Sequence, residues 1–399
     1  MQKSCVFMGS IPIGALFFMR IENMLLLSQS DTYIEIISDL DNLERDINLW
    51  CRFKGEEFVD KKQILNENKL KKGNFIYTIK KKTQTKFETF DPSLNIAPQG
   101  HGLAPNGVDI ELASPNYHFN FNSNNEIWSN NLEHIYEESK RSQWNATTDI
   151  SWDKIPAFSK EIEFVIAQIM TYLTENEFSA LYIPSKFLSQ ISPYFTSIPM
   201  LLSSIIGDES RHIEAFIKRA NATGLGVQYS TLTTQQSLYS LWKEEDYFKS
   251  SFLLHVMGEG TFIDLLRFIE ESFISLDDKE SAYLLSLARR DETRHVAYGM
   301  SNIKHTISQN PSVISKLKEV VFNRKNYLDN QSSESSLLLE SLAIMRGGNS
   351  DSSSISRGFE EVLELKKKME KNRTKRLIEC GIDEDLANDL SKAHTPNFM

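Results

Sequence analysis

The same five-residue pattern, Asp-Glu-x-Arg-His, occurs twice in the chain, in GDESRHIEAF and in RDETRHVAYG. In each copy the glutamate and the histidine are three residues apart, Glu209 with His212 and Glu292 with His295. Residues at this spacing lie about one turn apart on one face of an α-helix. A carboxylate and an imidazole placed in this way can bind one metal ion together. Two such helices that face each other would therefore supply two glutamates and two histidines to a common site.

Two further glutamates precede the repeated motif at nearly the same distance. Glu177 lies 32 residues before Glu209, and Glu259 lies 33 residues before Glu292. The chain therefore contains an internal repeat, whose offset is 82 residues for the first pair and 83 for the second. This spacing favours Glu177 over Glu175, since residues two apart on a helix do not face the same partner. We predict six metal ligands on four helices, two histidines and four glutamates.

Long segments with apolar residues at helical spacing carry these six residues. We predict that they form helices over 159–190, 199–221, 233–276 and 279–310. Pro184 should kink the first helix because it removes a backbone hydrogen bond, and the third should break near Glu245. Shorter helices are predicted over 128–144, 312–330, 333–345, 357–379 and 384–393. Aromatic residues near these helices are expected to pack in the core, namely Trp144, Trp152, Trp242, Tyr182 and Tyr298.

The first 125 residues carry weaker signals. The segment 73–90 alternates loosely between apolar and polar residues, which predicts one or two strands. The segment 95–119 is rich in proline and glycine and predicts a loop. The uncharged stretch 4–19 is too short to cross a bilayer and is expected to be a buried segment, with a start of the protein at Met24 as the alternative. We therefore expect an irregular, possibly β-containing N-terminal extension.

Composition limits the partners and the compartment. Lys and Arg total 44 against 54 for Asp and Glu, a net charge of −10, which argues against nucleic-acid and membrane partners. The cysteines Cys5, Cys51 and Cys380 are isolated, which fits a reducing, cytoplasmic compartment. Their spacing excludes a disulfide scaffold and an iron–sulfur cluster held by four cysteines of this chain. The basic run 363–376 is expected to form a solvated helix face, with a partner-docking surface as the alternative.

A glutamate followed by Glu-x-x-His, present twice on four helices, is the di-iron carboxylate pattern of ferritin-like bundles. Over about 155–310 the chain resembles the ferritin-like di-iron oxidases and oxygenases. Its motif is most similar to that of the hydroxylase subunits of bacterial multicomponent monooxygenases, and the p-aminobenzoate N-oxygenase type is a further relative. The resemblance implies a mostly α protein with a ferritin-like four-helix bundle over 126–310. The extension 1–125 would precede the bundle, and a helical C-terminal tail over 311–399 would follow it.

The resemblance also implies roles for residues around the ligands. Asp208 and Asp291 would accept a hydrogen bond from the metal-bound histidine on the facing helix, which fixes the orientation of the imidazole. Arg211 and Arg294 would pair with these aspartates, because buried arginines need carboxylate partners. No catalytic residue is predicted beyond the metal centre.

Some positions depart from the relatives. Ile263 stands where the multicomponent hydroxylases have a threonine, and Phe216 stands where ribonucleotide reductase small subunits have a radical tyrosine. The second departure disfavours a radical-storing reductase subunit. Ala288 replaces an extra histidine of the N-oxygenase type, which excludes a seventh ligand at that position. His255, four residues before Glu259, could be a replacement ligand, a group behind the ligands, or a core histidine bonded to a carbonyl.

By the resemblance, the site holds two iron ions, and iron with manganese is an alternative because ligand softness does not separate them. O2 would be the co-substrate, used to hydroxylate or N-oxygenate a small organic substrate. Electrons would come from a separate reductase or ferredoxin, because the chain has no flavin fingerprint and no iron–sulfur cysteines. The alternative is a ferritin-like protein that binds metal or a ligand without oxygenase turnover. A homodimer is also expected, and the substrate is left open.

Overall fold

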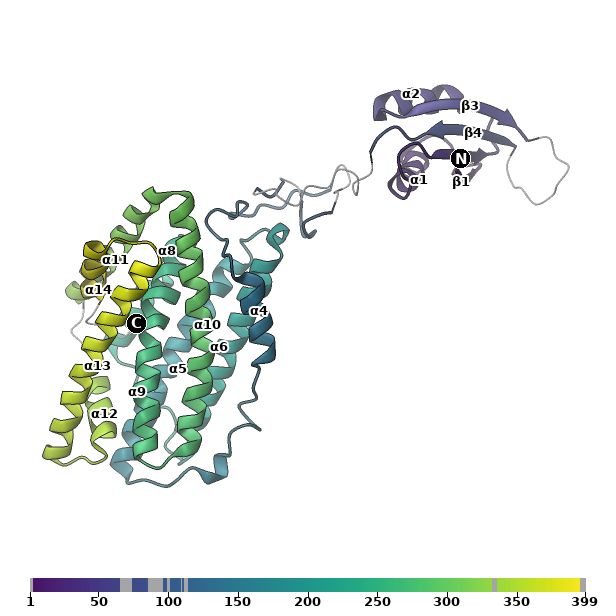
Figure 1. Cartoon of the computed structure of the whole chain (residues 1–399). Helices are drawn as coiled ribbons and strands as arrows, with labels where there is room; N and C mark the ends of the chain where they lie inside the picture. The colour runs from purple at the N-terminus through teal and green to yellow at the C-terminus, as the bar shows by residue number, and fades with distance from the viewer. Residues whose placement is uncertain are drawn as a thin grey trace. The chain divides into compact units, whose positions relative to one another are not determined.

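The computed structural model describes residues 3–64, 74–84, 96–98, 101–108, 110, 114–331 and 336–394. The chain divides into two compact units, Met1–Ser93 and Leu94–Met399. Helices dominate the second unit, and a small sheet lies in the first (Figure 1). The mostly α fold with a β-containing N-terminal region and a helical C-terminal region therefore agrees with the prediction from the sequence.

The first unit is a four-stranded sheet with two helices. Its elements are β1 Lys3–Gly9, α1 Ala15–Leu26, β2 Tyr33–Ser38, α2 Glu44–Lys54, β3 Glu57–Gln63 and β4 Phe75–Lys80. The strand order is β1-β2-β4-β3, with β1 parallel to β2 and the other neighbours antiparallel. Ile34 and Ile36 alternate with half-buried residues on β2, and they share one core with Phe17 and Ile47 of the helices. The region is thus more regular than predicted.

Strand β4 falls within the segment predicted to form strands, whereas residues 85–90 of that segment lie outside the described residues. The uncharged stretch 4–19 forms most of β1 and the start of α1. Within β1 the side chains alternate between buried and exposed, as in a strand with one covered face. Most residues of 10–19 are exposed or half-buried, so that the prediction of a buried segment is wrong for this part.

The second unit is built from long helices (Figure 1). The elements that lead into and form the bundle are α4 Leu132–Arg141, η1 Trp152–Lys154, α5 Lys160–Leu188, η2 Pro193–Phe195, α6 Ser197–Asn221, α7 Leu232–Trp242, α8 Tyr247–Ser251, η3 Phe252–Glu259, α9 Gly260–Ser275 and α10 Lys279–Gln309. The tail elements are η4 Pro311–Val313, α11 Ile314–Gln331, α12 Ser336–Gly347, α13 Ser352–Glu379 and α14 Glu384–His394. The predicted helices are confirmed, to within a few residues at most ends.

Local sequence explains where these helices begin. The Ser159 side chain accepts a hydrogen bond from the backbone N–H of Ile162 and caps α5, and Asp278 caps α10 in the same way. The predicted break near Glu245 separates α7 from α8, and Asp246 caps α8. Pro184 lies inside α5, which continues past it to Leu188.

The bundle is formed by α5 against α6, and by η3 and α9 against α10. One apolar core runs through it and includes residues of the tail helices, since α12 packs on α5 and α13 packs on α9. Among the described residues, none of the helices has both the length and the apolar character needed to cross a membrane.

Two predictions hold for only part of their residues, since most lysines of the basic run 363–376 are exposed as predicted. Arg373 and Arg376 of the basic run do not join a solvated face, because the first is buried and the guanidinium of the second is largely buried. Trp242 lies at the end of α7 and is 47% exposed, and Tyr182 is 50% exposed. Trp144 and Tyr298 are buried, as predicted.

Candidate metal centre

All six predicted ligands lie in one buried cluster inside the bundle. They come from four elements, α5, α6, η3 and α10, and each is at most 1% exposed. The cluster consists of two overlapping groups whose donor atoms lie within 4.8 Å of one another. These groups are Glu177, Glu209, His212 and Glu292, and Glu209, Glu259, Glu292 and His295. The structure therefore brings the two copies of the motif together.

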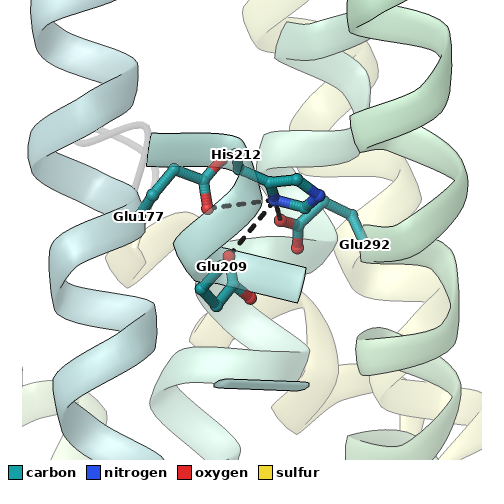
Figure 2. Close-up of side chains that lie close together, drawn as sticks. All are labelled: Glu177, Glu209, His212 and Glu292. Atoms are coloured by element: carbon teal, nitrogen blue, oxygen red, sulfur yellow. Dashed lines mark ion pairs between the residues drawn. The ribbon is translucent and has the colours of Figure 1, made fainter. Parts of the chain in front are cut away.

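The first group surrounds one nitrogen of His212 (Figure 2). His212 Nδ1 lies 3.3 Å from Glu209 Oε2, its neighbour one turn earlier on α6. It also lies 3.5 Å from Glu177 Oε2 and 3.5 Å from Glu292 Oε1. Three carboxylates from three helices thus converge on one imidazole.

The second group repeats this arrangement around His295. His295 Nδ1 lies 2.9 Å from Glu209 Oε1 and 3.6 Å from Glu292 Oε2. Glu209 and Glu292 therefore belong to both groups, and each offers one oxygen to either histidine. Two carboxylates shared between two neighbouring positions are placed as bridging ligands would be.

Within the described residues, the inner side of the cluster lacks hydrogen-bond partners. The buried side-chain atoms without one are Glu177 Oε1, both carboxylate oxygens of Glu209 and of Glu292, Glu259 Oε1, His212 Nδ1 and His295 Nδ1. Leaving buried polar atoms unpaired costs about 1–3 kcal/mol each, more for charged groups. A set of carboxylate oxygens and imidazole nitrogens fits divalent iron or manganese. All six predicted ligands are present in this set, and each of the four elements contributes at least one of them.

The outer nitrogens of both histidines are held by aspartates across the bundle. His212 Nε2 on α6 donates to Asp291 Oδ2 on α10 at 3.2 Å, and His295 Nε2 on α10 donates to Asp208 Oδ2 on α6 at 3.2 Å. Each aspartate precedes the glutamate of its own motif and contacts the histidine of the other motif. These bonds leave Nδ1 of each histidine directed to the cluster.

Two arginines neutralise these aspartates. Arg294 Nη2 lies 2.7 Å from Asp291 Oδ1 and 3.0 Å from Asp208 Oδ2. Arg211 Nη2 contacts Asp208 and lies 3.1 Å from Asp291 Oδ2. Each arginine therefore bridges both aspartates, so that two positive charges stand against two negative ones. This layer contributes no net charge to the buried site.

Burial and neighbouring charges shift the pKa values in the cluster. Burial raises the pKa of Glu177 well above its usual value, and the charge of Glu209 adds to this effect. Burial also raises the pKa of Glu259. It opposes the charged form of His212 and His295, yet the facing carboxylates outweigh it and hold both pKa values well above 6.5. Without a metal ion, protons therefore neutralise part of the negative charge.

The pKa of Asp291 shifts in the opposite direction. Burial favours its protonated form, but the hydrogen bond from His212 and the charge of Arg294 keep its pKa far below the usual range. Asp208 shows the same balance, with His295 as the main stabilising partner, and its pKa is lowered. Both aspartates are thus ionised acceptors.

His255 lies beside the cluster, on η3. Its Nδ1 is 2.7 Å from Glu259 Oε2, so that its partner is a carboxylate and not a backbone carbonyl. The segment η3 is a π-helix, which the sequence did not reveal, and such segments are frequent at functional sites. Gly299 on α10 permits the close approach, because a Cβ there would lie 2.4 Å from His255 Cβ.

Sequence reasoning missed the contacts that two residues make to the site. Trp144, expected only as a core residue, donates from Nε1 to Asp291 Oδ2 at 2.7 Å, and its ring lies 5.2 Å from the Arg211 guanidinium. Gln143, beside it, accepts from Arg211 Nη1 at 2.7 Å. Both residues lie just after α4, outside any regular element, so that no periodic pattern in the sequence indicates which way their side chains point.

Comparisons with families of proteins and with curated proteins give no match. Among solved structures the chain is similar to R2-like ligand-binding oxidases. One mutant with an aerobically reconstituted Mn/Fe cofactor is 14% identical to this chain, with a TM-score of 0.42. The match covers 67% of this chain and 92% of the mutant's chain. A mutant with an Fe/Fe cofactor is 14% identical, has a TM-score of 0.43, and covers the same shares.

A further mutant, anaerobically reconstituted with Mn/Fe, is 13% identical with a TM-score of 0.48, and covers 64% of this chain and 95% of that chain. Likeness at these values carries no argument about the chemistry of this chain. That chemistry follows from the side chains of the cluster.

Proposed function

We propose that the chain is a non-haem di-iron oxidoreductase that activates O2 to hydroxylate or N-oxygenate a small organic substrate. The observation that supports this most strongly is the buried cluster of four glutamates and two histidines, whose inner atoms have no hydrogen-bond partner in the part of the chain that the structure describes. Structural ion pairs do not leave so many buried acceptors unpaired, because the desolvation cost is not recovered. Two metal ions would recover it.

The charges of the cluster favour two divalent cations. The four glutamates carry four negative charges when ionised, and the histidines bind metal in their neutral form. The surrounding layer of Asp208, Asp291, Arg211 and Arg294 is neutral as a whole. Two divalent ions would therefore bring the buried site to neutrality. Iron at both positions and iron with manganese satisfy this count equally.

The proposed ligand assignment follows the two groups. Glu177 and His212 would bind one ion, and Glu259 and His295 the other. Glu209 and Glu292, which belong to both groups, would bridge the ions. When bound, ferrous iron supplies the electrons that reduce O2.

The chain's own residues prepare the site in two ways. Asp291 and Asp208 fix the tautomer and ring orientation of the histidines, which keeps Nδ1 directed inward. Glu177 has to release a proton before it binds a cation, because burial raises its pKa. Metal binding is therefore expected to release protons and to weaken as the pH falls.

The proposal includes partners outside the chain. Electrons would arrive from a separate reductase or ferredoxin, since the sequence contains neither a flavin fingerprint nor clustered cysteines. We further propose a cytoplasmic protein that acts on a small molecule, as a homodimer.

A second candidate is a metal-binding or ligand-binding protein of the same fold that does not turn over an oxygenase substrate. It shares the metal cluster but does not use it to oxygenate a substrate. The same buried cluster supports this candidate, because metal binding alone needs only the ligands.

The test uses the full chain reconstituted with ferrous iron, a chemical reductant and 18O2, in the presence of a panel of small aromatic and aliphatic compounds. Incorporation of 18O into a product supports the oxygenase. O2 uptake without labelled product supports the second candidate, and no uptake contradicts the oxygenase. Glu209→Ala should abolish uptake, whereas Glu214→Ala, an exposed glutamate on the same helix α6, should retain it.

A further inference from the structure

An open groove lies between helices α5 and α7, away from the metal cluster. It has a volume of about 290 Å³, and most of its surface is apolar. On each helix the lining residues are three or four positions apart, so that they share one helix face. The lining includes Glu175, Phe178 and Tyr182 of α5, and Gln235, Tyr239 and Trp242 of α7.

Four aromatic side chains of the groove remain accessible. Phe178, Tyr182, Tyr239 and Trp242 are 41%, 50%, 55% and 47% exposed. The Phe178 and Tyr182 rings lie 6.3 Å apart in nearly parallel planes, and the Trp242 ring lies 5.9 Å from Tyr182 and is nearly perpendicular to it. These three rings form a row along the groove. The faces of such rings carry negative electrostatic potential and attract cations.

One end of the groove holds a carboxylate without a positive partner. Glu175 is half-buried, and its Oε1 accepts from Gln235 Nε2 at 2.9 Å. Its neighbours Gln235 and Ser230 are neutral, and no lysine, arginine or histidine among the described residues forms an ion pair with it. Ser179, one turn further along α5, also lines the groove, and its buried Oγ has no partner in the described part of the chain. Both groups can accept hydrogen bonds from an ammonium ion.

The opposite end of the groove already has a paired positive charge. Lys186, one turn after Tyr182 on α5, donates from Nζ to the backbone carbonyls of Trp242 and Glu244. Its charge repels a second cation, and its donors are occupied. A ligand therefore places its cation at Glu175 and its apolar part against Tyr182 and Trp242.

We propose that this groove binds a small organic ammonium ion with an apolar body, of the arylalkylamine class. Glu175 and Ser179 accept from the ammonium group, and the rings of Tyr182 and Trp242 contact the body. Glu175 and Tyr182 are seven residues apart, about 10 Å along a helix, which sets the length of the ligand. A neutral ligand of the same shape leaves the partly buried carboxylate without a cation. The site does not depend on the proposed metal centre.

The test is titration calorimetry of the full chain at neutral pH with two probes of nearly equal shape. Phenylbutylamine is a cation under these conditions, and phenylbutanol carries a neutral hydroxyl in place of the ammonium group. The amine should bind saturably, with one site per chain. The alcohol should bind about threefold more weakly or less, the factor for losing an exposed ion pair or cation–π contact.

Two variants separate the charge from the apolar contact. Glu175→Gln keeps the shape of the side chain, so that it should weaken binding of the amine about threefold or more and leave the alcohol unchanged. Trp242→Leu should weaken both probes, because it removes a ring that contacts their body. Glu161→Gln makes the same charge change in the exposed first turn of α5 and should leave both affinities unchanged.

Three outcomes would overturn the proposal. The first is that the amine does not bind saturably, and the second is that the amine and the alcohol bind equally well. The third is that Glu175→Gln weakens the amine no more than Glu161→Gln does. If Glu175→Gln does not fold, an unchanged affinity of Trp242→Leu for the amine overturns the proposal in its place.

Discussion

Replacing Gly299 by alanine should disturb the contact that holds His255 beside the cluster. The added Cβ would lie 2.4 Å from His255 Cβ and 3.5 Å from His255 Cα. Rotation of the His255 side chain does not relieve this overlap, because the position of Cβ is fixed by the backbone. The segment η3 has to move away from α10 by about 1 Å to restore ordinary contact distances.

The magnitude of the packing cost follows by comparison with Gly207, which lies inside helix α6 and has no described atom within 4 Å of an added Cβ. Alanine stabilises a helix interior relative to glycine by about 0.5–1 kcal/mol, and both variants gain this. Gly299→Ala also overpacks a buried contact, at a cost of about 1–3 kcal/mol. The difference in unfolding free energy between the two variants therefore isolates the packing cost, about 1–3 kcal/mol.

The assay is urea unfolding of the metal-free protein, followed by tryptophan fluorescence. Four of the five tryptophans lie in the second unit, which makes the signal report mainly on the bundle. Gly299→Ala should unfold at lower urea concentration than the wild type, and Gly207→Ala at the same or a higher concentration. Equal stability of the two variants would refute the close approach of η3 to α10.

Two other predictions follow from shifted pKa values. In the metal-free protein, Asp291→Asn should destabilise by about 3–5 kcal/mol at pH 7, because it leaves Arg294 buried beside an uncharged partner. The native pKa of Asp291 is depressed, so its contribution is present above its unfolded pKa of about 3.9 and is lost as the pH falls below that value. The difference in unfolding free energy between the wild type and Asp291→Asn, measured by urea unfolding, should therefore become smaller toward pH 2. A difference that does not depend on pH would contradict this. Burial raises the pKa of Cys51 and Cys380 to about 12, while Cys5 is exposed. One thiol of the native protein should therefore react rapidly with a disulfide reagent at pH 8, and three thiols should react after unfolding. Rapid reaction of three thiols in the native protein would contradict the burial of Cys51 and Cys380.

The residues of the cluster could be chosen from sequence because their spacing carries the information. Glu209 with His212 and Glu292 with His295 share a helical face by geometry alone, and the repeat offset selected Glu177. In the structure Glu177 joins the cluster, while Glu175 accepts from Gln235 on α7. Local periodicity thus sufficed for these side chains.

Other features depend on contacts between distant segments, which periodicity does not encode. The pairing of β1 with β2 and the hydrogen bond from Trp144 to Asp291 are of this kind. The basic run on α13 shows the same limit, since its composition predicts a solvated face. Arg373 turns inward because Thr261 and the backbone carbonyl of Ser391 accept its hydrogen bonds.

The central claim, that the bundle binds two divalent metal ions, is tested most directly by the iron content after anaerobic reconstitution with ferrous iron and removal of the excess. The account predicts about two irons per chain, and well below two in Glu209→Ala and in His295→Ala. A wild-type chain that retains no iron, or two irons in both variants, would contradict it.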